Sequence, residues 1–178
     1  MFSDPLKNLK VLGLREDNIV ADLGAGTGFY SILASHLVPR GKVYAVEVQR
    51  DLIEIIKGKI KHEHAKNIEA LWGNIEKIGG TKLGDGVADA VILSNVLFQI
   101  ENKDDTIKEA KRILKKDGQV LCIDWSDSTS LISQQKINII PKNKVREIFE
   151  KHGFIFVRDI DAGEHHYGMI LKRLNESR

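Results

Sequence analysis

The sequence lacks most features that mark a secreted, membrane-spanning or nucleic-acid-binding protein. Its single cysteine, Cys122, has no partner for an internal disulfide, and its position within an apolar run predicts a small buried side chain. No apolar run is long enough to cross a bilayer, and no signal peptide opens the chain. A formal net charge of +2 is too small to favour a nucleic-acid partner. We therefore expect a cytoplasmic protein that inserts into no membrane.

Sets of metal-ligating side chains are also missing from the sequence. His62 and His64 lie two residues apart on a predicted helix, so their side chains point to different sides and cannot chelate one ion. His36 and His152 are single helix residues, for which packing or solvent exposure is the expected role. No other group of histidine, cysteine or acidic residues has the spacing of metal ligands, so we expect no metal site.

What the sequence does contain is an alternation of strand-like and helix-like segments. The length of 178 residues predicts one domain, spanning residues 1–178. Five runs are typical of buried strands: Ile19–Leu23, Lys42–Val48, Ile68–Trp72, Ala90–Leu93 and Gln119–Trp125. Helices are expected at Phe29–Val38 and where apolar residues recur at helical spacing: Leu52 to Ile60, Ile107 to Leu114 and Val145 to His152. Ser3 or Asp4 is expected to cap a first helix that has Pro5 in its first turn.

The last part of the chain has a different connection. The strand-like runs Phe154–Ile160 and Tyr167–Leu174 are separated by only a few residues, which is too short for a parallel crossover. They are therefore predicted to form an antiparallel hairpin. Together these features predict an α/β fold, a Rossmann-like three-layer sandwich around a mostly parallel seven-stranded sheet with one antiparallel strand near the C-terminus.

A glycine-rich turn follows the first expected strand. In the stretch VADLGAGTGFYS, Gly24, Gly26 and Gly28 lie between that strand and a helix. A dinucleotide fingerprint needs a further glycine at position 29, where the helix approaches the strand, but this chain has Phe29. Asp22, beside the turn, is also a poor neighbour for a pyrophosphate and suits a ligand that carries an amine. The stretch therefore favours an adenosine compound other than a dinucleotide.

The pattern D-x-G-x-G-x-G resembles the first motif of class I S-adenosylmethionine (SAM) methyltransferases. The acidic end of the second strand at Glu47 and the terminal hairpin also resemble that family, although NAD enzymes share the acidic residue. Within the class, the chain looks closest to the small methylases of the ubiquinone/menaquinone-biosynthesis type. The segments EAKRILKKDGQVLCIDW and HHYGMILKR carry this closer match. The resemblance covers nearly the whole chain and implies SAM as the cofactor.

The resemblance also implies which residues bind the cofactor. Glu47 stands where an acidic side chain accepts both ribose hydroxyls. Asn74 stands where the family commonly has an aspartate against the adenine amino group, and its side-chain oxygen can accept that hydrogen bond without charge. Ser94 follows the fourth strand, where the family backs the methionine part of the cofactor. The full expected set is Asp22, Gly24, Ala25, Gly26, Gly28, Glu47, Val48, Gly73, Asn74, Ile75 and Ser94.

The carboxyl ends of the strands are where an open parallel sheet binds its ligand. Asp22, Glu47, Asn74 and Ser94 all fall on that edge and are expected to line one cleft. The turn of the terminal hairpin lies on the same edge.

Three residues of that turn, His165, His166 and Tyr167, are candidates for catalysis, with a solvated hairpin tip as the alternative. We favour His166 of the two histidines, because its neighbour begins a strand and holds it better. Asp124 and Trp125 end the fifth strand at this edge and are candidates for shaping an acceptor pocket; a plain strand-end turn is the alternative.

The resemblance implies methyl transfer by in-line displacement, which needs nucleophile and methyl carbon held in a near-attack geometry. After the fourth strand the chain has Ser94-Asn95-Val96-Leu97, which lacks the motif of amino-methylating DNA enzymes. We therefore expect a small-molecule acceptor, and a protein side chain stays open as the other class of acceptor. The alternative is a catalytically inactive SAM-binding module that regulates or scaffolds a partner.

Overall fold

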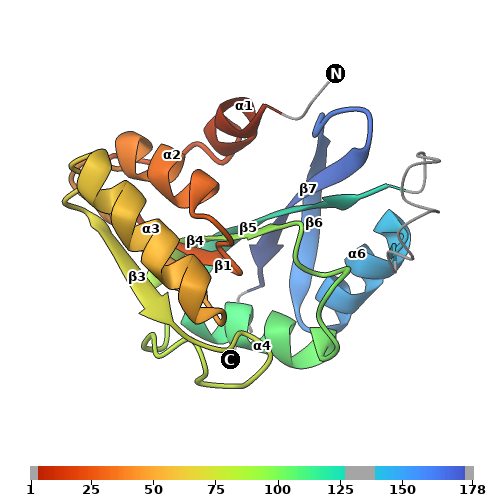
Figure 1. Cartoon of the computed structure of the whole chain (residues 1–178). Helices are drawn as coiled ribbons and strands as arrows, with labels where there is room; N and C mark the ends of the chain where they lie inside the picture. Colours follow the sequence, from red (N-terminus) through yellow and green to blue (C-terminus); the bar gives the residue numbers. More distant parts are fainter. Residues whose placement is uncertain (1–3, 127–138, 175–178) are drawn as a thin grey trace.

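The computed structural model describes residues 4–126 and 139–174, which form three layers around one sheet (Figure 1). The strands are β1 (Ile19–Leu23), β2 (Lys42–Glu47), β3 (Ile68–Trp72), β4 (Ala88–Ser94), β5 (Leu114–Trp125), β6 (Phe154–Ile160) and β7 (His166–Arg173). The helices are α1 (Pro5–Lys10), α2 (Phe29–Leu37), α3 (Arg50–His62), α4 (Lys103–Ile113) and α6 (Lys142–Lys151). None of the helices within these described ranges combines the length and the apolar character that a bilayer crossing requires.

The sheet has seven strands in the order β3-β2-β1-β4-β5-β7-β6. Strands β1 to β5 pair in parallel, whereas β7 pairs antiparallel with both β5 and β6. This confirms the predicted fold, including the antiparallel strand inserted near the C-terminus. Because β6 runs in the same direction as β5, the β6–β7 turn lies at the carboxyl edge of the parallel strands, as the sequence predicted.

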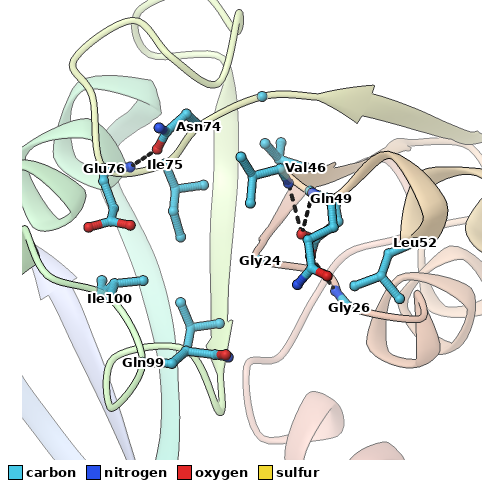
Figure 2. Close-up of a pocket in the computed structure, with 14 residues that line it drawn as sticks. Gly24, Gly26, Val46, Gln49, Leu52, Asn74, Ile75, Glu76, Gln99 and Ile100 are labelled. Atoms are coloured by element: carbon cyan, nitrogen blue, oxygen red, sulfur yellow. Dashed lines mark hydrogen bonds between the residues drawn. The ribbon is translucent and has the colours of Figure 1, made fainter.

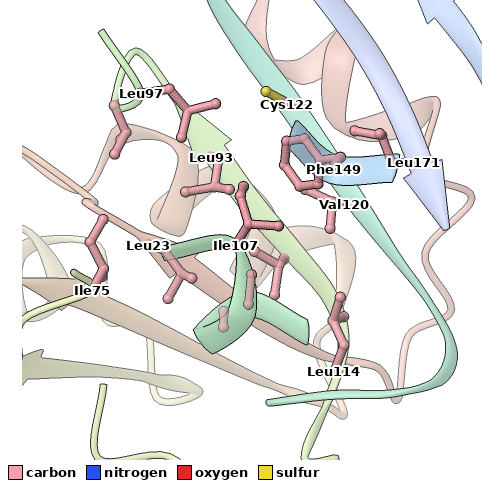
Figure 3. Close-up of a cluster of buried hydrophobic side chains, with 14 of the residues drawn as sticks. Leu23, Ile75, Leu93, Leu97, Ile107, Leu114, Val120, Cys122, Phe149 and Leu171 are labelled. Atoms are coloured by element: carbon pink, nitrogen blue, oxygen red, sulfur yellow. The ribbon is translucent and has the colours of Figure 1, made fainter. Parts of the chain in front are cut away.

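Apolar side chains cover both faces of the sheet. One cluster packs α1, α2 and α3 against the sheet through residues such as Leu9, Ala34 and Ile56. The other packs α4 and α6 against the opposite face through Ile107 and Phe149, and it includes Cys122 (Figure 3). The cysteine is fully buried, as predicted. Because β1 and β4 are covered on both faces, the turns that follow them are held on a rigid support.

The boundaries differ from the sequence prediction mainly at the start of β5. Leu114 was expected to continue the preceding helix, but it adopts an extended backbone and pairs with Ala88 of β4. The register then shifts before Ala90 pairs with Gln119, so β5 begins with an irregular segment. Pairing with β4 overrides the helical spacing of Leu114. At the N-terminus the capping prediction is confirmed, because the Asp4 side chain accepts the N–H groups of Leu6 and Lys7.

A buried ion pair fastens the chain between β3 and β4 to α4. Glu109 is fully buried and accepts the Thr81 hydroxyl at 2.5 Å and the Gly79 N–H at 2.8 Å. Arg112 also binds Glu109, since its Nε donates to the carboxylate at 2.8 Å. Burial raises the pKa of Glu109, but hydrogen bonds from Arg112, Thr81 and the backbone offset this and lower it to about 2. The carboxylate therefore stays ionised within a satisfied network.

Candidate functional site

A cavity of about 380 Å³ lies at the carboxyl edge of the parallel strands (Figure 2). Four segments form its walls: the turn after β1, the end of β2 with the start of α3, the segment after β3 and the loop after β4. The lining residues are Gly24, Gly26, Val46, Glu47, Val48, Gln49, Leu52, Gly73, Asn74, Ile75, Glu76, Val96, Gln99 and Ile100. Its volume falls within the range of small-molecule and cofactor sites.

The glycine turn opens the backbone toward this cavity. Gly24 and Gly26 have positive φ angles of 75° and 56°, which side-chain-bearing residues rarely adopt. A Cβ atom at Gly24 would lie 2.7 Å from Cγ2 of Val96, so glycine there lets the loop after β4 pack against the turn. A Cβ at Gly26 would meet nothing within 4 Å, which leaves free space for a ligand over the backbone.

Glu47 fastens the same turn from the end of β2. Its side chain accepts the N–H of Gly26 at 2.9 Å through Oε2, and those of Val48 and Gln49 at 2.8 and 2.9 Å through Oε1. A carboxylate has about four lone-pair positions, so these three bonds leave room for one more donor. Accepting two ribose hydroxyls, as predicted, therefore requires that one backbone bond be exchanged for a hydroxyl.

Asp22 lies behind the turn and does not line the cavity. It is only 2% exposed, and its Oδ2 accepts the Ser31 hydroxyl of α2 at 2.6 Å. Burial raises its pKa, the Ser31 hydrogen bonds lower it, and the neighbouring charge of Glu47 raises it, giving a pKa of about 6. No described cation pairs with this carboxylate. The arrangement leaves an acidic group poised near neutrality directly beneath the glycines.

The segment after β3 forms the opposite wall. The Asn74 side-chain oxygen accepts the N–H of Glu76 at 2.9 Å (Figure 2). In turn, Oε2 of Glu76 accepts the N–H groups of Glu101 and Asn102, at 2.9 and 2.8 Å, just before α4. Ile75 adds an apolar surface between them. This wall therefore combines a flat apolar contact with the side-chain amide predicted to recognise an adenine.

The loop between β4 and α4 supplies the remaining wall. Val96, Gln99 and Ile100 line the cavity, whereas Ser94 does not and is half-buried within the ladder, opposite Ile123 of β5. Asn95 has a positive φ of 57°, and its buried side-chain oxygen has no hydrogen-bond partner among the residues that the structure describes. Such a group is costly to bury unless something completes its bonding.

The hairpin turn lies beside this loop but outside the cavity lining. Across the β5–β7 ladder, Tyr167 pairs with Asp124 and His166 pairs with Trp125. Because neighbouring side chains of a strand alternate, the Tyr167 and His166 side chains point to opposite faces of the sheet. The His166 and Trp125 rings lie 4.2 Å apart. His165 Nδ1, His166 Nε2 and the Tyr167 hydroxyl are all buried without a hydrogen-bond partner within residues 4–126 and 139–174.

Burial sets the ionisation of these hairpin groups. It lowers the pKa of His166, and the neighbouring His165 lowers it further. It raises the pKa of the Tyr167 phenol, with smaller contributions from Cys122 and Asp124. Near neutral pH the histidine is therefore an uncharged base and the tyrosine an uncharged hydroxyl.

Asp124 ends β5 between the hairpin and the loop after β4. It is 2% exposed, and it accepts the N–H of Trp125 at 2.8 Å and that of Phe98 at 3.2 Å. Burial raises its pKa to about 6, although these backbone hydrogen bonds and one from Leu97 act in the opposite direction. Asp124 and Trp125 thus meet the hairpin at the edge where the sequence expected an acceptor pocket.

The structure thus brings together seven of the residues predicted to bind a cofactor: Gly24, Gly26, Glu47, Val48, Gly73, Asn74 and Ile75. The other four do not line the cavity: Ala25 and Gly28 lie in the turn after β1, Asp22 lies within β1, and Ser94 is the last residue of β4. Sequence reasoning missed Val46, Gln49, Leu52, Glu76, Val96, Gln99 and Ile100. Most of these follow a strand end by a few residues, which is the signal that points to them.

The lining fits an adenosyl compound in three respects. Space is open above Gly26, Glu47 keeps unused acceptor capacity at the end of β2, and apolar side chains from Ile75 and Ile100 can contact a flat base. Within residues 4–126 and 139–174 no three histidine, cysteine or acidic side chains gather as metal ligands would. The predicted absence of a metal stays a prediction.

Comparison with known proteins places this geometry in a family. The family model described as a methyltransferase domain matches residues 14–165. The demethylmenaquinone methyltransferase of Lactococcus lactis is 33% identical over 138 residues, covering 77% of this chain and 54% of the relative. A ubiquinone/menaquinone biosynthesis C-methyltransferase of Haemophilus ducreyi is 28% identical over 137 residues, covering 73% and 52%. The chain spans about half the length of these curated relatives.

A solved structure resembles the chain over nearly its whole length. The crystal structure of a SAM-dependent methyltransferase from Aquifex aeolicus superposes with a TM-score of 0.86 and 28% sequence identity. The match covers 97% of this chain and 91% of that one. The three-layer sheet with its inserted antiparallel strand is therefore shared along the full described chain.

Proposed function

This chain belongs to the methyltransferase domain family, and from that premise we propose that it transfers a methyl group from SAM to a small-molecule acceptor. The resemblance to class I methyltransferases drawn from the sequence is confirmed, and with it the expected cofactor. The observation that carries the proposal is the meeting of the glycine turn, Glu47 and Asn74 around one cavity at the carboxyl edge of the sheet. When bound, SAM supplies an electrophilic methyl group on a sulfonium.

The chain's own residues bind and orient that cofactor in the proposal. Glu47 accepts ribose hydroxyls with its remaining acceptor capacity, and the backbone above Gly26 gives the ligand room. Asn74 and Ile75 recognise the adenine edge and face. Asp22, beneath the turn, acts on the amine-bearing end of the ligand through its charge. Fixing the methyl group in one position is the main contribution of these residues to rate.

An aromatic small-molecule acceptor fits the other side of the site. Both relatives described above carry names that refer to methylation of quinone-type compounds, and we extend that acceptor class to this chain. The Trp125 and His166 rings, whose centroids lie 4.2 Å apart, offer an aromatic surface at the end of β5. The Tyr167 hydroxyl, which projects from the other face of the sheet than the His166 ring, and the Asn95 oxygen have no hydrogen-bond partner among the described residues, and an acceptor lying across the sheet edge would bond them through its own hydroxyl or carbonyl.

His166 is the proposed base for this reaction. Its uncharged imidazole can take a proton from an acceptor hydroxyl or ring carbon as the methyl group is transferred. His165 and Tyr167 are proposed to help orient the acceptor. The cytoplasmic location and the lack of a nucleic-acid partner remain predictions from composition.

Calorimetry and product analysis test the proposal. The protein should bind SAM and S-adenosylhomocysteine and should bind NAD far more weakly, because Phe29 replaces the glycine that a dinucleotide needs. Incubation with SAM and a quinol should then yield S-adenosylhomocysteine. Tighter binding of NAD than of SAM would contradict the proposed cofactor. Tight SAM binding without turnover of any quinol or phenol in a panel would instead favour the inactive binding module.

A further inference from the structure

Two carboxylates hold the loop between β4 and α4 against the cofactor cavity, one at each end. Glu76 binds the N–H groups at the α4 end of the loop, on the adenine side. Asp124 binds the N–H groups of Leu97 and Phe98 nearer β4. Between β4 and these contacts lies Val96, whose methyl groups fill the space above Gly24. The position of this loop therefore depends on both carboxylates.

Of the carboxylates Glu76 and Asp124, Asp124 also contacts the end of β5, where the acceptor is proposed to bind. Its Oδ1 accepts the N–H of Trp125, whose ring stacks with His166. Its partner across the β5–β7 ladder is Tyr167, and Ser126 N–H donates to the His165 carbonyl at 2.9 Å just beyond it. One buried side chain thus contacts the main chain of the cofactor loop and sits against the strand pair that carries the proposed base.

We propose that Asp124 is a positioning residue, whose ionised carboxylate holds the loop after β4 in the cofactor-binding arrangement and aligns that loop with the acceptor-binding end of β5 and β7. This inference rests on the proposed function, since it assigns a role within that same site. Protonation turns one of the two carboxylate oxygens into a hydroxyl donor, so the N–H groups of Trp125, Leu97 and Phe98 compete for the acceptor positions that remain and the loop is held less firmly. The protonation state of Asp124 then affects both cofactor binding and acceptor binding.

The surroundings of Asp124 decide over which pH range this happens. Among the described residues, the ionisable groups coupled to it are Lys103 on α4, Cys122 on β5 and Tyr167 on β7. Burial raises the pKa of both the thiol and the phenol, so neither is charged near neutrality. Burial raises the pKa of Asp124 to about 6, and it outweighs the backbone hydrogen bonds and the smaller effect of the Lys103 ammonium, which all favour the ionised carboxylate.

Hydrogen exchange in the ligand-free protein tests the loop contact without any cofactor. After correction for intrinsic exchange, the Phe98 amide should exchange at least about tenfold faster in Asp124→Asn than in the wild type, because the variant has one acceptor oxygen for the N–H groups of Trp125 and Phe98, which the carboxylate binds through two. Asp159→Asn, which removes an exposed carboxylate on β6, should leave Phe98 unchanged. In the wild type, the corrected exchange should accelerate as pH falls through about 6. Equal protection in Asp124→Asn and wild type would overturn the inference.

Binding of S-adenosylhomocysteine tests the coupling to the cofactor. If only the ionised form of Asp124 is competent, wild-type affinity should fall at least about tenfold between pH 7.5 and pH 5. Asp124→Asn should bind weakly at both pH values and lose that tenfold factor, and Asp124→Glu should recover part of the affinity. The pKa of Asp22 is also about 6. The pH dependence of binding in Asp22→Asn therefore shows how much of the effect comes from Asp22.

The possible failures are distinguishable. If the pH dependence of S-adenosylhomocysteine binding persists in Asp124→Asn and disappears in Asp22→Asn, it arises from Asp22, and the inference is overturned. No wild-type binding at pH 7.5 instead contradicts the proposed function and leaves the exchange test to decide the role of Asp124. Circular dichroism checks that each variant folds; if Asp124→Asn does not, the wild-type exchange profile and Asp22→Asn still give the answer.

Discussion

Buried carboxylates occur in two regions of this molecule, and their surroundings are opposite. Glu109 on α4 is surrounded by Arg112, Thr81 and backbone N–H groups, which lower its pKa to about 2. Asp22 and Asp124 at the carboxyl edge of the sheet are equally inaccessible, but no described cation pairs with either, and burial raises both pKa values to about 6. The first arrangement stabilises the fold, whereas the second costs stability and leaves charge available for a ligand.

The carboxyl edge of the sheet also differs from the Glu109 region in its unsatisfied groups. The buried Asn95 oxygen, both hairpin histidines and the Tyr167 hydroxyl have atoms without hydrogen-bond partners in the part of the chain that the structure describes. In the Glu109 network both carboxylate oxygens and the Thr81 hydroxyl are bonded. These unsatisfied atoms gather where a ligand is proposed to bind. A bound substrate would supply the hydrogen bonds that they lack.

The largest effect in this comparison is expected from His166. Replacement by alanine should lower turnover about 10²–10⁴-fold and leave affinity for S-adenosylhomocysteine nearly unchanged, because the base is lost and the cofactor walls are kept. Wild-type activity should fall as pH drops through the lowered pKa of His166, since the protonated imidazole cannot accept a proton. His62→Ala, an exposed substitution on α3, is the control. Full activity in both His165→Ala and His166→Ala would remove catalysis from the hairpin.

The Glu109 network should show the next largest effect, in stability alone. Its lowered pKa means that Glu109 contributes about 3 kcal/mol of stability above pH 4.5, which is lost progressively as pH falls toward 2. Glu109→Gln should therefore lose about 3 kcal/mol in urea unfolding at pH 7 and much less near pH 3. Glu150→Gln, which affects an exposed pair with Arg146, should change stability by less than about 1 kcal/mol. An equal loss at both pH values would mean that packing, and not charge, accounts for the effect.

The stability that depends on Asp22 should change with pH in the opposite direction from that of Glu109. Because its pKa is raised, stability is highest when it is protonated and declines as pH rises from about 4 through 6. Asp22→Asn keeps an oxygen for the Ser31 hydroxyl and removes the buried charge, so it should raise unfolding stability by up to about 2 kcal/mol at pH 7.5 and weaken SAM binding. Urea unfolding at pH 5 and 7.5 checks this. A destabilised variant at pH 7.5 would place Asp22 with Glu109 among the structural carboxylates.

The smallest expected effect concerns Glu47. Glu47→Gln removes charge-assisted bonds to the ribose and weakens those to the glycine turn, so affinity for S-adenosylhomocysteine should fall at least about tenfold. Calorimetry on this variant and on Glu54→Gln, an exposed pair on α3, gives the comparison. The pKa of Asp22 should also drop once the neighbouring charge is gone. An unchanged dissociation constant would show that the ribose is held elsewhere.

The sequence could predict the parts of this site that lie directly at strand ends. The glycine turn, Glu47 and Asn74 follow from strand assignment and the rule that ligands bind at carboxyl edges, and all line the cavity. The sequence also placed Asp22 at that edge. Its hydrogen-bond partner, however, is Ser31 in the first turn of α2. No local pattern reveals that this hydroxyl turns the carboxylate inward.

The loop after β4 and the hairpin were harder to predict for different reasons. Val96 lines the cavity because it packs on Gly24, a contact between segments more than seventy residues apart. In the hairpin, side chains alternate between the two faces of the sheet, so starting the strand at His166 and pairing it with Trp125 decides that Tyr167 faces Asp124. Such register comes from strand pairing, which a single sequence does not display.

The strand order carries a consequence for how the chain is made. In the described sheet β6 has β7 as its one neighbour, and β7 separates it from β5. During synthesis from the N-terminus, β1 to β5 emerge first and can assemble the walls of the cofactor cavity. Strand β6 then has no edge to join until β7 leaves the ribosome. A nascent chain stalled before residue 166 should therefore be able to recognise the cofactor while its acceptor half is still unbuilt.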